Sequence, residues 1–231
     1  MKHRYGQVFT CFFGLFLLAA PLAASADQTA RQILARASLN QAIEPTHLKG
    51  RLRIEGIKIP FDLILQKNTA EYQFHDPEQS LILNFKEKPP SLMEKANGVT
   101  TSVTGAKLAQ KIRNTGVTYG DISLRFLNWP DPVLAGEDTI ALRKAWKLDI
   151  PSPDRQSQYS KARVWIDQES GMLMRMEGYD PQGNLLKRFE VISTQKLKGR
   201  WMLKQMRIED FDLATHKVVS RTYLEITDDL G

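Results

Sequence analysis

The chain has 231 residues, a formal net charge of +6, 42% hydrophobic residues and a single cysteine. This length is sufficient for one hydrophobic core, and one cysteine excludes a fold held by internal disulfides. The basic residues are scattered through strand-like segments instead of forming a run, which indicates a solvated β surface and argues against nucleic-acid binding.

The N-terminal segment is typical of an export signal. Lys2 and Arg4 precede an uncharged apolar run, residues 8–22, which is followed by Ala24-Ser25-Ala26. This small-residue pattern is that of a signal-peptidase site, and the run is shorter than the ~20 residues that span a bilayer. We therefore expect residues 1–26 to be a signal peptide cleaved after Ala26, rather than an uncleaved anchor, and we expect a periplasmic location.

Cys11 lies within this segment and follows Val8-Phe9-Thr10, which is not a lipobox. The expected mature chain, residues 27–231, then has no cysteine, no N-terminal lipid anchor and a net charge of +4. It is expected to form a single domain.

Residues 27–42 carry apolar side chains at helical spacing, and Pro45 prevents continuation of the helix. From Leu48 the apolar period changes to two, which predicts strands. Runs of this kind cover residues 48–55, 61–65, 72–74 and 81–85, and they are typical of an antiparallel meander with one dry face.

The middle of the chain differs. Residues 105–113 have a helical pattern, and Thr118 to Asp121 has the form of a capping box that starts a second helix. Ile122, Phe126 and Trp129 would share one face of that helix. Strands are then expected over 133–150, 158–168, 171–180, 185–195, 200–211 and 215–227. The fold class is therefore mainly β with a helical insertion (α+β).

The sequence contains few candidates for catalytic residues. The three histidines beyond the signal, His47, His75 and His216, share no ligand spacing, and no nucleophile, phosphate-binding or zinc-protease motif is present. We expect a protein that is not an enzyme, with no catalytic residues, no metal and no cofactor.

Two apolar features are more informative. Met172, Met174 and Met176 have the spacing of one strand face, and flexible methionine suits either a surface for variable apolar shapes or an ordinary core. The face of Ile122, Phe126 and Trp129 could close one end of a core or cover an apolar cavity.

Four segments together resemble the LolA-like family of outer-membrane lipoprotein-sorting proteins: residues 108–113, 118–130, 159–167 and 179–187. The resemblance covers nearly the whole mature chain and contains no catalytic motif. It implies a curved antiparallel sheet that forms an unclosed half-barrel, with helices covering its concave side and an apolar cavity between them for acyl chains.

The resemblance thus implies a soluble periplasmic carrier or binding protein for lipids or lipoprotein acyl chains, involved in outer-membrane lipoprotein sorting. Its partners would be acyl chains and inner- or outer-membrane transport components, without nucleic acid, and the protein would be a monomer. Alternatives are a non-carrier envelope sensor or scaffold on the same fold and a periplasmic hydrolase with a non-standard site. The residues expected to line a lipid cavity are Leu63, Leu65, Ile122, Phe126, Trp129, Met172, Met174 and Met176.

Overall fold

A computed structural model describes residues 22–39, 45–155, 157–197 and 199–229. Its thirteen strands form one antiparallel sheet in the order β6-β5-β4-β3-β2-β1-β13-β12-β11-β10-β9-β8-β7. The strands are β1 (Thr46–Ile54), β2 (Ile57–Gln66), β3 (Thr69–His75), β4 (Glu78–Asn84), β5 (Ser91–Ala96), β6 (Val99–Ser102), β7 (Val133–Ile140), β8 (Arg143–Pro151), β9 (Lys161–Asp167), β10 (Leu173–Tyr179), β11 (Leu185–Leu197), β12 (Arg200–Phe211) and β13 (Val218–Asp229).

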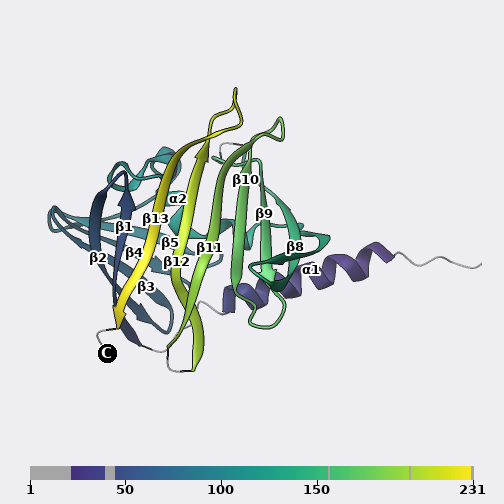
Figure 1. Cartoon of the computed structure of the whole chain (residues 1–231), viewed down its shortest axis with the longest axis horizontal. Coiled ribbons are helices and arrows are strands. Elements are labelled where there is room, and N and C mark those ends of the chain that lie inside the picture. The colour runs from purple at the N-terminus through teal and green to yellow at the C-terminus, as the bar shows by residue number, and fades with distance from the viewer. Residues whose placement is uncertain (1–21, 40–44, 156, 198, 230–231) are drawn as a thin grey trace, which may run out of the picture.

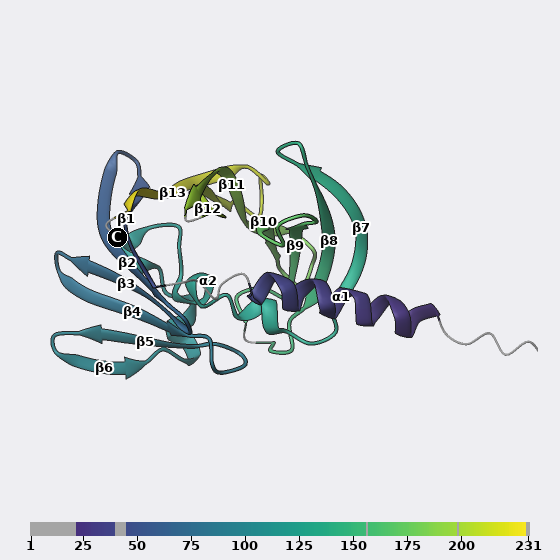
Figure 2. The ribbon, with the colours of Figure 1, turned by 90° about the horizontal axis from the view of Figure 1, so that it is seen from below.

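The sheet curves into an arch whose ends, β6 and β7, do not pair with each other. Figure 2 shows this arch from below, with α2 on its concave side and α1 across its open side near β7. In Figure 1, α2 lies behind the central strands, and α1 runs along the lower right past β8. The expected fold class, a mainly β protein with an unclosed half-barrel, is confirmed.

Five helical elements accompany the sheet: α1 (Leu22–Leu39), η1 (Gly105–Ala109), η2 (Ile112–Asn114), α2 (Tyr119–Ser123) and η3 (Arg125–Asn128). We call residues 105–128 the plug. Helix α1 begins earlier than expected; the expected extension over residues 40–42 lies outside the described residues, as does most of the expected signal segment, residues 1–21.

Two helix predictions in the plug are wrong in detail. Residues 105–113 form 3₁₀ turns instead of an α-helix. The second helix ends after five residues because Leu124 adopts a left-handed conformation (φ 51°), and the chain continues as the 3₁₀ helix η3. Ile122 and Phe126 therefore do not share one continuous helical face.

The strand predictions also need two corrections. Residues 133–150 form a hairpin, β7–β8, because Ala141 and Leu142 both take positive φ values (49° and 65°) and reverse the chain. Strands β5 and β6 were not expected, since their residues lack a clear alternation of apolar and polar side chains.

The outer face of the sheet carries a ladder of alternating charges. It runs across six strands through directly opposed residues: Asp149, Arg163, Glu177, Arg188, Glu209 and Arg221. Arg163 Nε lies 2.5 Å from Asp149 Oδ1, and Arg221 Nε lies 2.8 Å from Glu209 Oε1. Opposite charges on facing residues stabilise strand pairs. The scattered basic residues of these strands therefore stabilise the sheet.

The concave side holds two apolar clusters. The first joins β1–β5 to plug residues such as Ile112 and Ile122. The second joins β8–β10 to α1 and η3, and includes Phe126 and Val164. Phe189 of β11 packs against both clusters. Burial of this apolar area is the main stabilising contribution to such a fold.

Asp167, at the end of β9, gives a prediction about acid stability. Burial alone would raise the pKa of this carboxyl, but hydrogen bonds from Arg143 and Ser170 lower it from 3.8 to about 2. A depressed native pKa contributes stability above the unfolded pKa, and that contribution is lost as the pH falls through the native pKa. By linkage it amounts to about 2 kcal/mol.

Asp167→Asn should therefore lower the free energy of unfolding at pH 7 by about this amount. The difference from the unmodified protein should shrink between pH 4 and pH 2. Urea unfolding across this range measures it, with the exposed carboxylate variant Glu78→Gln as control. A difference that stays constant with pH would contradict the assignment.

Candidate functional site

A capping box starts the plug helix α2, as the sequence predicts. The backbone N–H of Thr118 donates to Asp121 Oδ2 (2.8 Å), and the N–H of Asp121 donates to Thr118 Oγ1 (3.1 Å). This arrangement satisfies two backbone donors that a helix start would otherwise leave free. It also fixes the Asp121 carboxylate at the inner surface of the sheet.

Asp121 is the centre of a buried polar network, and only 1% of its side chain is exposed. Lys187 of β11 donates to Asp121 Oδ2 (2.9 Å), while Tyr159 and Gln158 donate to Oδ1, each at 2.7 Å. Lys187 also donates to the carbonyl of Gly116 (2.6 Å). Every contact of the carboxylate is thus with a donor, which offsets the cost of burying its charge.

Tyr159 takes part as a neutral donor. Burial, and then the negative charge of Asp121, raise the pKa of its hydroxyl well above its ordinary value of 10. Its ring lies over Gly178 of β10, where an added Cβ would be 2.4 Å from ring carbons. Only glycine leaves room for the ring at this position, so β10 and Tyr159 are fitted to each other.

The network brings together three of the segments that carry the family resemblance. Asp121 lies in residues 118–130, Tyr159 in residues 159–167 and Lys187 in residues 179–187. Their side chains meet between the two apolar clusters. Sequence reasoning did not single out Lys187 or Tyr159, because their partners are 66 and 38 residues away along the chain.

A second polar network links α2 and η1 of the plug to the sheet. Glu94 of β5 accepts from Tyr119 Oη and Gln79 Nε2, each at 2.6 Å, and pairs with Lys107 of η1. Burial would raise the pKa of Glu94, but these donors and the lysine charge lower it. The plug is therefore bound to the sheet by polar contacts at η1 and at α2.

Helix α1 is attached differently. It buries Ala30, Leu34 and Ala37 in the second apolar cluster, against η3 and the strands of that side. At its C-terminal end Arg36 donates to the carbonyl of Glu169 (2.6 Å), and Arg31 pairs with the exposed Asp131 (3.0 Å). The helix thus covers an apolar surface through mostly small side chains and exposed polar contacts.

The eight residues expected to line a cavity do not meet in one place. Leu63, Leu65 and Ile122 belong to the first apolar cluster. Phe126, Trp129 and Met176 belong to or pack on the second. Met174 lies in a third cluster with Trp165, and Met172 packs against that cluster.

The prediction that Met174 and Met176 share one face is therefore wrong. The pairing of β10 with β9 shifts register between Leu173 and Arg175, so Met174 occupies an irregular position. Such a bulge breaks the alternation of side chains. Met176 packs with Val164, whereas Met174 packs with Trp165, which points to the other face of β9.

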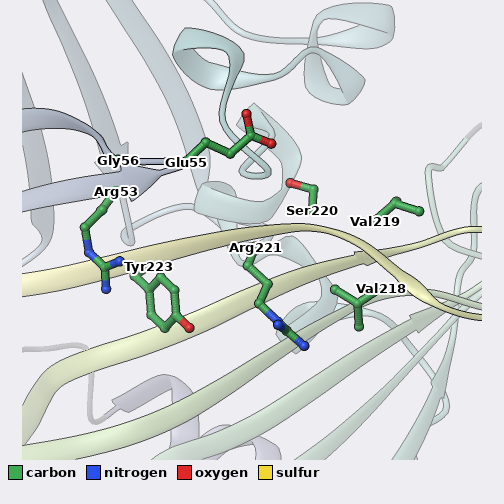
Figure 3. Close-up of a pocket in the computed structure, with 8 residues that line it drawn as sticks. All are labelled: Arg53, Glu55, Gly56, Val218, Val219, Ser220, Arg221 and Tyr223. Atoms are coloured by element: carbon green, nitrogen blue, oxygen red, sulfur yellow. The ribbon is translucent and has the colours of Figure 1, made fainter.

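Two pockets open at opposite rims of the sheet. The first, of about 360 Å³, lies between the β1–β2 turn and the start of β13 and is drawn in Figure 3. Its polar lining is already engaged: Arg53 pairs with Glu225 and stacks 4.3 Å from the centre of the Tyr223 ring. The second, of about 440 Å³, adjoins Leu142 and the Arg143–Asp167 pair.

Two histidines that are distant in sequence approach one carboxylate on the sheet. His75 Nε2 lies 2.9 Å from Asp62 Oδ2, and His47 Nε2 lies 3.8 Å from Asp62 Oδ1. Within the described part of the chain, no group of three or more His, Cys, Asp or Glu side chains has a geometry that would hold a metal ion. The helices described there are also too short or too polar to cross a bilayer.

Several solved structures share this fold. A putative outer-membrane lipoprotein-sorting protein domain from Vibrio parahaemolyticus aligns with a TM-score of 0.69 at 13% identity, covering 89% of this chain and 92% of that one. A DUF1329 family protein from Desulfovibrio piger gives 0.62 at 16% identity over 88% and 92%. A LolA superfamily protein from Nitrosomonas europaea gives 0.60 at 18% identity over 87% and 92%.

These likenesses confirm the expected LolA-like fold. The comparison with curated proteins finds no match. A family model described as "Uncharacterized protein" matches residues 95–228, which is more than half of the chain, and the chain belongs to that family.

The buried ion pair gives the second prediction. Lys187→Met removes the cation beside Asp121, and breaking a buried pair from one side costs about 3–5 kcal/mol. Adding Asp121→Asn keeps the side-chain shape and removes the unpaired charge, so the double variant should recover part of that loss. Chemical unfolding of the single and double variants measures the coupling.

Lys196→Met is the matched control, because Lys196 is exposed and surface substitutions usually change stability by less than about 0.5 kcal/mol. Equal effects of Lys187→Met and Lys196→Met would show that the buried pair does not hold the plug.

Proposed function

We propose that the mature chain is a periplasmic carrier or binding protein for lipid or lipoprotein acyl chains that takes part in outer-membrane lipoprotein sorting. The observation that carries the proposal is the covering of an apolar concave surface by α1. That helix contributes Ala30, Leu34 and Ala37, whose displacement would expose an apolar surface beside Phe126 and Met176 to an acyl chain.

The physical need for such a surface is direct. Each methylene group exposed to water costs about 0.8 kcal/mol, so an acyl chain crosses an aqueous compartment only when covered. The acyl chain would take the place of α1 and contact residues of the second apolar cluster, including Phe126, Trp129 and Met176. Leu63, Leu65 and Ile122 lie on the other side of the Asp121–Lys187 network and would line a second compartment.

The comparisons support the proposal through the fold. Two of the similar structures are those of a putative outer-membrane lipoprotein-sorting protein domain and of a LolA superfamily protein. In the proposed role the chain binds and releases cargo without a catalytic step, metal or cofactor. It acts as a monomer and exchanges cargo with inner- or outer-membrane transport components.

A second candidate is a non-carrier scaffold on the same fold. The observation that favours it is the tight filling of the interior, where Leu148, Ile150 and Val164 are fully buried. In this case α1 would be a permanent part of the core, and acyl chains would find no room beneath it.

A matched pair of variants on α1 separates the two candidates. Leu34 is buried, whereas the adjacent Ala35 is exposed, so Leu34→Asp and Ala35→Asp add the same charge to a buried and to an exposed position of the helix. In a carrier, Leu34→Asp should loosen α1 and strengthen the binding of a fluorescent fatty acid by about tenfold or more, because desolvation of the carboxylate weakens the helix contact with which the acyl chain competes. Circular dichroism should retain its β signal.

Ala35→Asp should bind and release the probe as the unmodified protein does. The proposal fails if the unmodified protein binds no fatty-acid probe and carries no lipid in native mass spectra after detergent-free purification. Cooperative unfolding of Leu34→Asp, with no probe binding by any variant, is the result expected of a scaffold.

A further inference from the structure

We propose that one rim of the half-barrel, formed by the β11–β12 and β7–β8 hairpin ends, docks on an anionic phospholipid surface. We call this the basic rim. The inference concerns the outside of the protein and does not depend on cargo in its interior. It rests on charge, on three exposed apolar residues and on the register of the strands.

The register places both hairpin ends on one rim. Strand β8 begins at Arg143, opposite the end of β9, and β10 begins where β9 ends. Strand β11 ends at Leu197 and β12 begins opposite it at Arg200. The connections 141–142, 168–172 and 198–199 therefore lie at the same end of the strands. Figure 1 shows the β11–β12 hairpin reaching beyond its neighbours at the bottom of the view.

The β11–β12 hairpin is strongly basic. Between Glu190 and Glu209 the chain has no acidic residue and has five basic ones, at positions 196, 198, 200, 204 and 207. Lys196 and Lys204 are exposed. Basic residues at a membrane surface are attracted by anionic headgroups. Arg207 is paired with Glu190 and Glu209, so the charge available to headgroups lies toward the end of the hairpin, at Lys196 and Lys204.

An aromatic residue accompanies this charge. Trp201 is 44% exposed, and Lys196 Nζ lies 5.1 Å from its ring centre. Ile192 of the same hairpin is 43% exposed. Tryptophan beside lysine is favoured at the boundary between water and lipid, because the ring has an apolar body and a polar N–H.

The β7–β8 hairpin presents a second apolar tip. Leu142 is 98% exposed, although it is a large aliphatic residue in a turn with φ 65°. A branched residue in this conformation is strained, and neither burial nor turn geometry explains its presence. The acidic residues beside it, Asp167 and Glu169, both accept from Arg143, so their charges are partly compensated.

These features fit a lipid surface better than an apolar protein groove. The apolar residues are few and lie on two hairpins, Trp201 and Ile192 on one and Leu142 on the other, and Lys196 lies over the Trp201 ring. A folded protein partner would need a complementary apolar patch, whereas a bilayer accepts isolated apolar tips between anionic headgroups. Docking through an acidic protein partner instead is one outcome of the test below.

The test is co-sedimentation of the full protein with vesicles of phosphatidylcholine alone or mixed with phosphatidylglycerol. The unmodified protein should bind the mixed vesicles, bind the neutral ones much less, and lose binding as salt increases. Lys196→Glu combined with Lys204→Glu should weaken binding by at least about tenfold. Trp201→Ser and Leu142→Asn should each weaken it less, and Asn tolerates the backbone conformation at position 142.

Lys58→Glu combined with Lys217→Glu is the matched control. Both lysines are exposed near connections of the opposite rim, and the pair changes the net charge by the same amount. The control should retain most binding. The proposal is overturned if the two double variants bind alike or if the protein does not bind mixed vesicles; the second result would leave an acidic protein as the partner of Lys196 and Lys204.

Discussion

The buried ion pair between Asp121 and Lys187 is the constraint on which the arrangement of this protein depends. The sheet does not close, so its concave apolar face must be covered by other elements. The plug that covers much of it consists of a five-residue helix and short 3₁₀ turns, which are far too short to be stable alone. Their position comes from the polar contacts of Asp121 with Lys187 and of Glu94 with Tyr119 and Lys107.

This anchoring divides the concave side into two apolar clusters with unequal covers. The first is closed by Ile112, Ile122 and Tyr119 of the anchored plug. The second is closed largely by α1, whose buried contacts are Ala30, Leu34 and Ala37. A cover made of small side chains buries less apolar area and is easier to displace than an anchored one. In the proposed carrier the plug is thus the fixed part and α1 the part that yields to cargo.

Much of the fold could be predicted from the sequence, because residues such as Leu48, Leu63 and Leu83 alternate with polar neighbours along regular strands. The capping box at Thr118 was likewise predictable from the sequence, since its two hydrogen bonds join residues only three positions apart. The predictions that failed depend on single backbone irregularities: the left-handed Leu124, the Ala141–Leu142 turn and the bulge at Met174. None of these positions has the glycine or asparagine that signals a left-handed turn. The Asp121–Lys187 pair could not be predicted from the sequence for a different reason: the two residues are distant along the chain, and only the folded sheet brings them together.

Hydrogen exchange read by mass spectrometry tests the central claim, that α1 is displaced while the plug stays anchored, most directly. The account predicts that amides of residues 30–37 exchange faster than those of residues 117–123 and of the central strands, since local opening requires less free energy than global unfolding. Added lipid should alter the protection of α1 and of η3 and leave residues 117–123 unchanged. The account would be contradicted if α1, the plug and the sheet exchanged as one cooperative unit and did not respond to lipid.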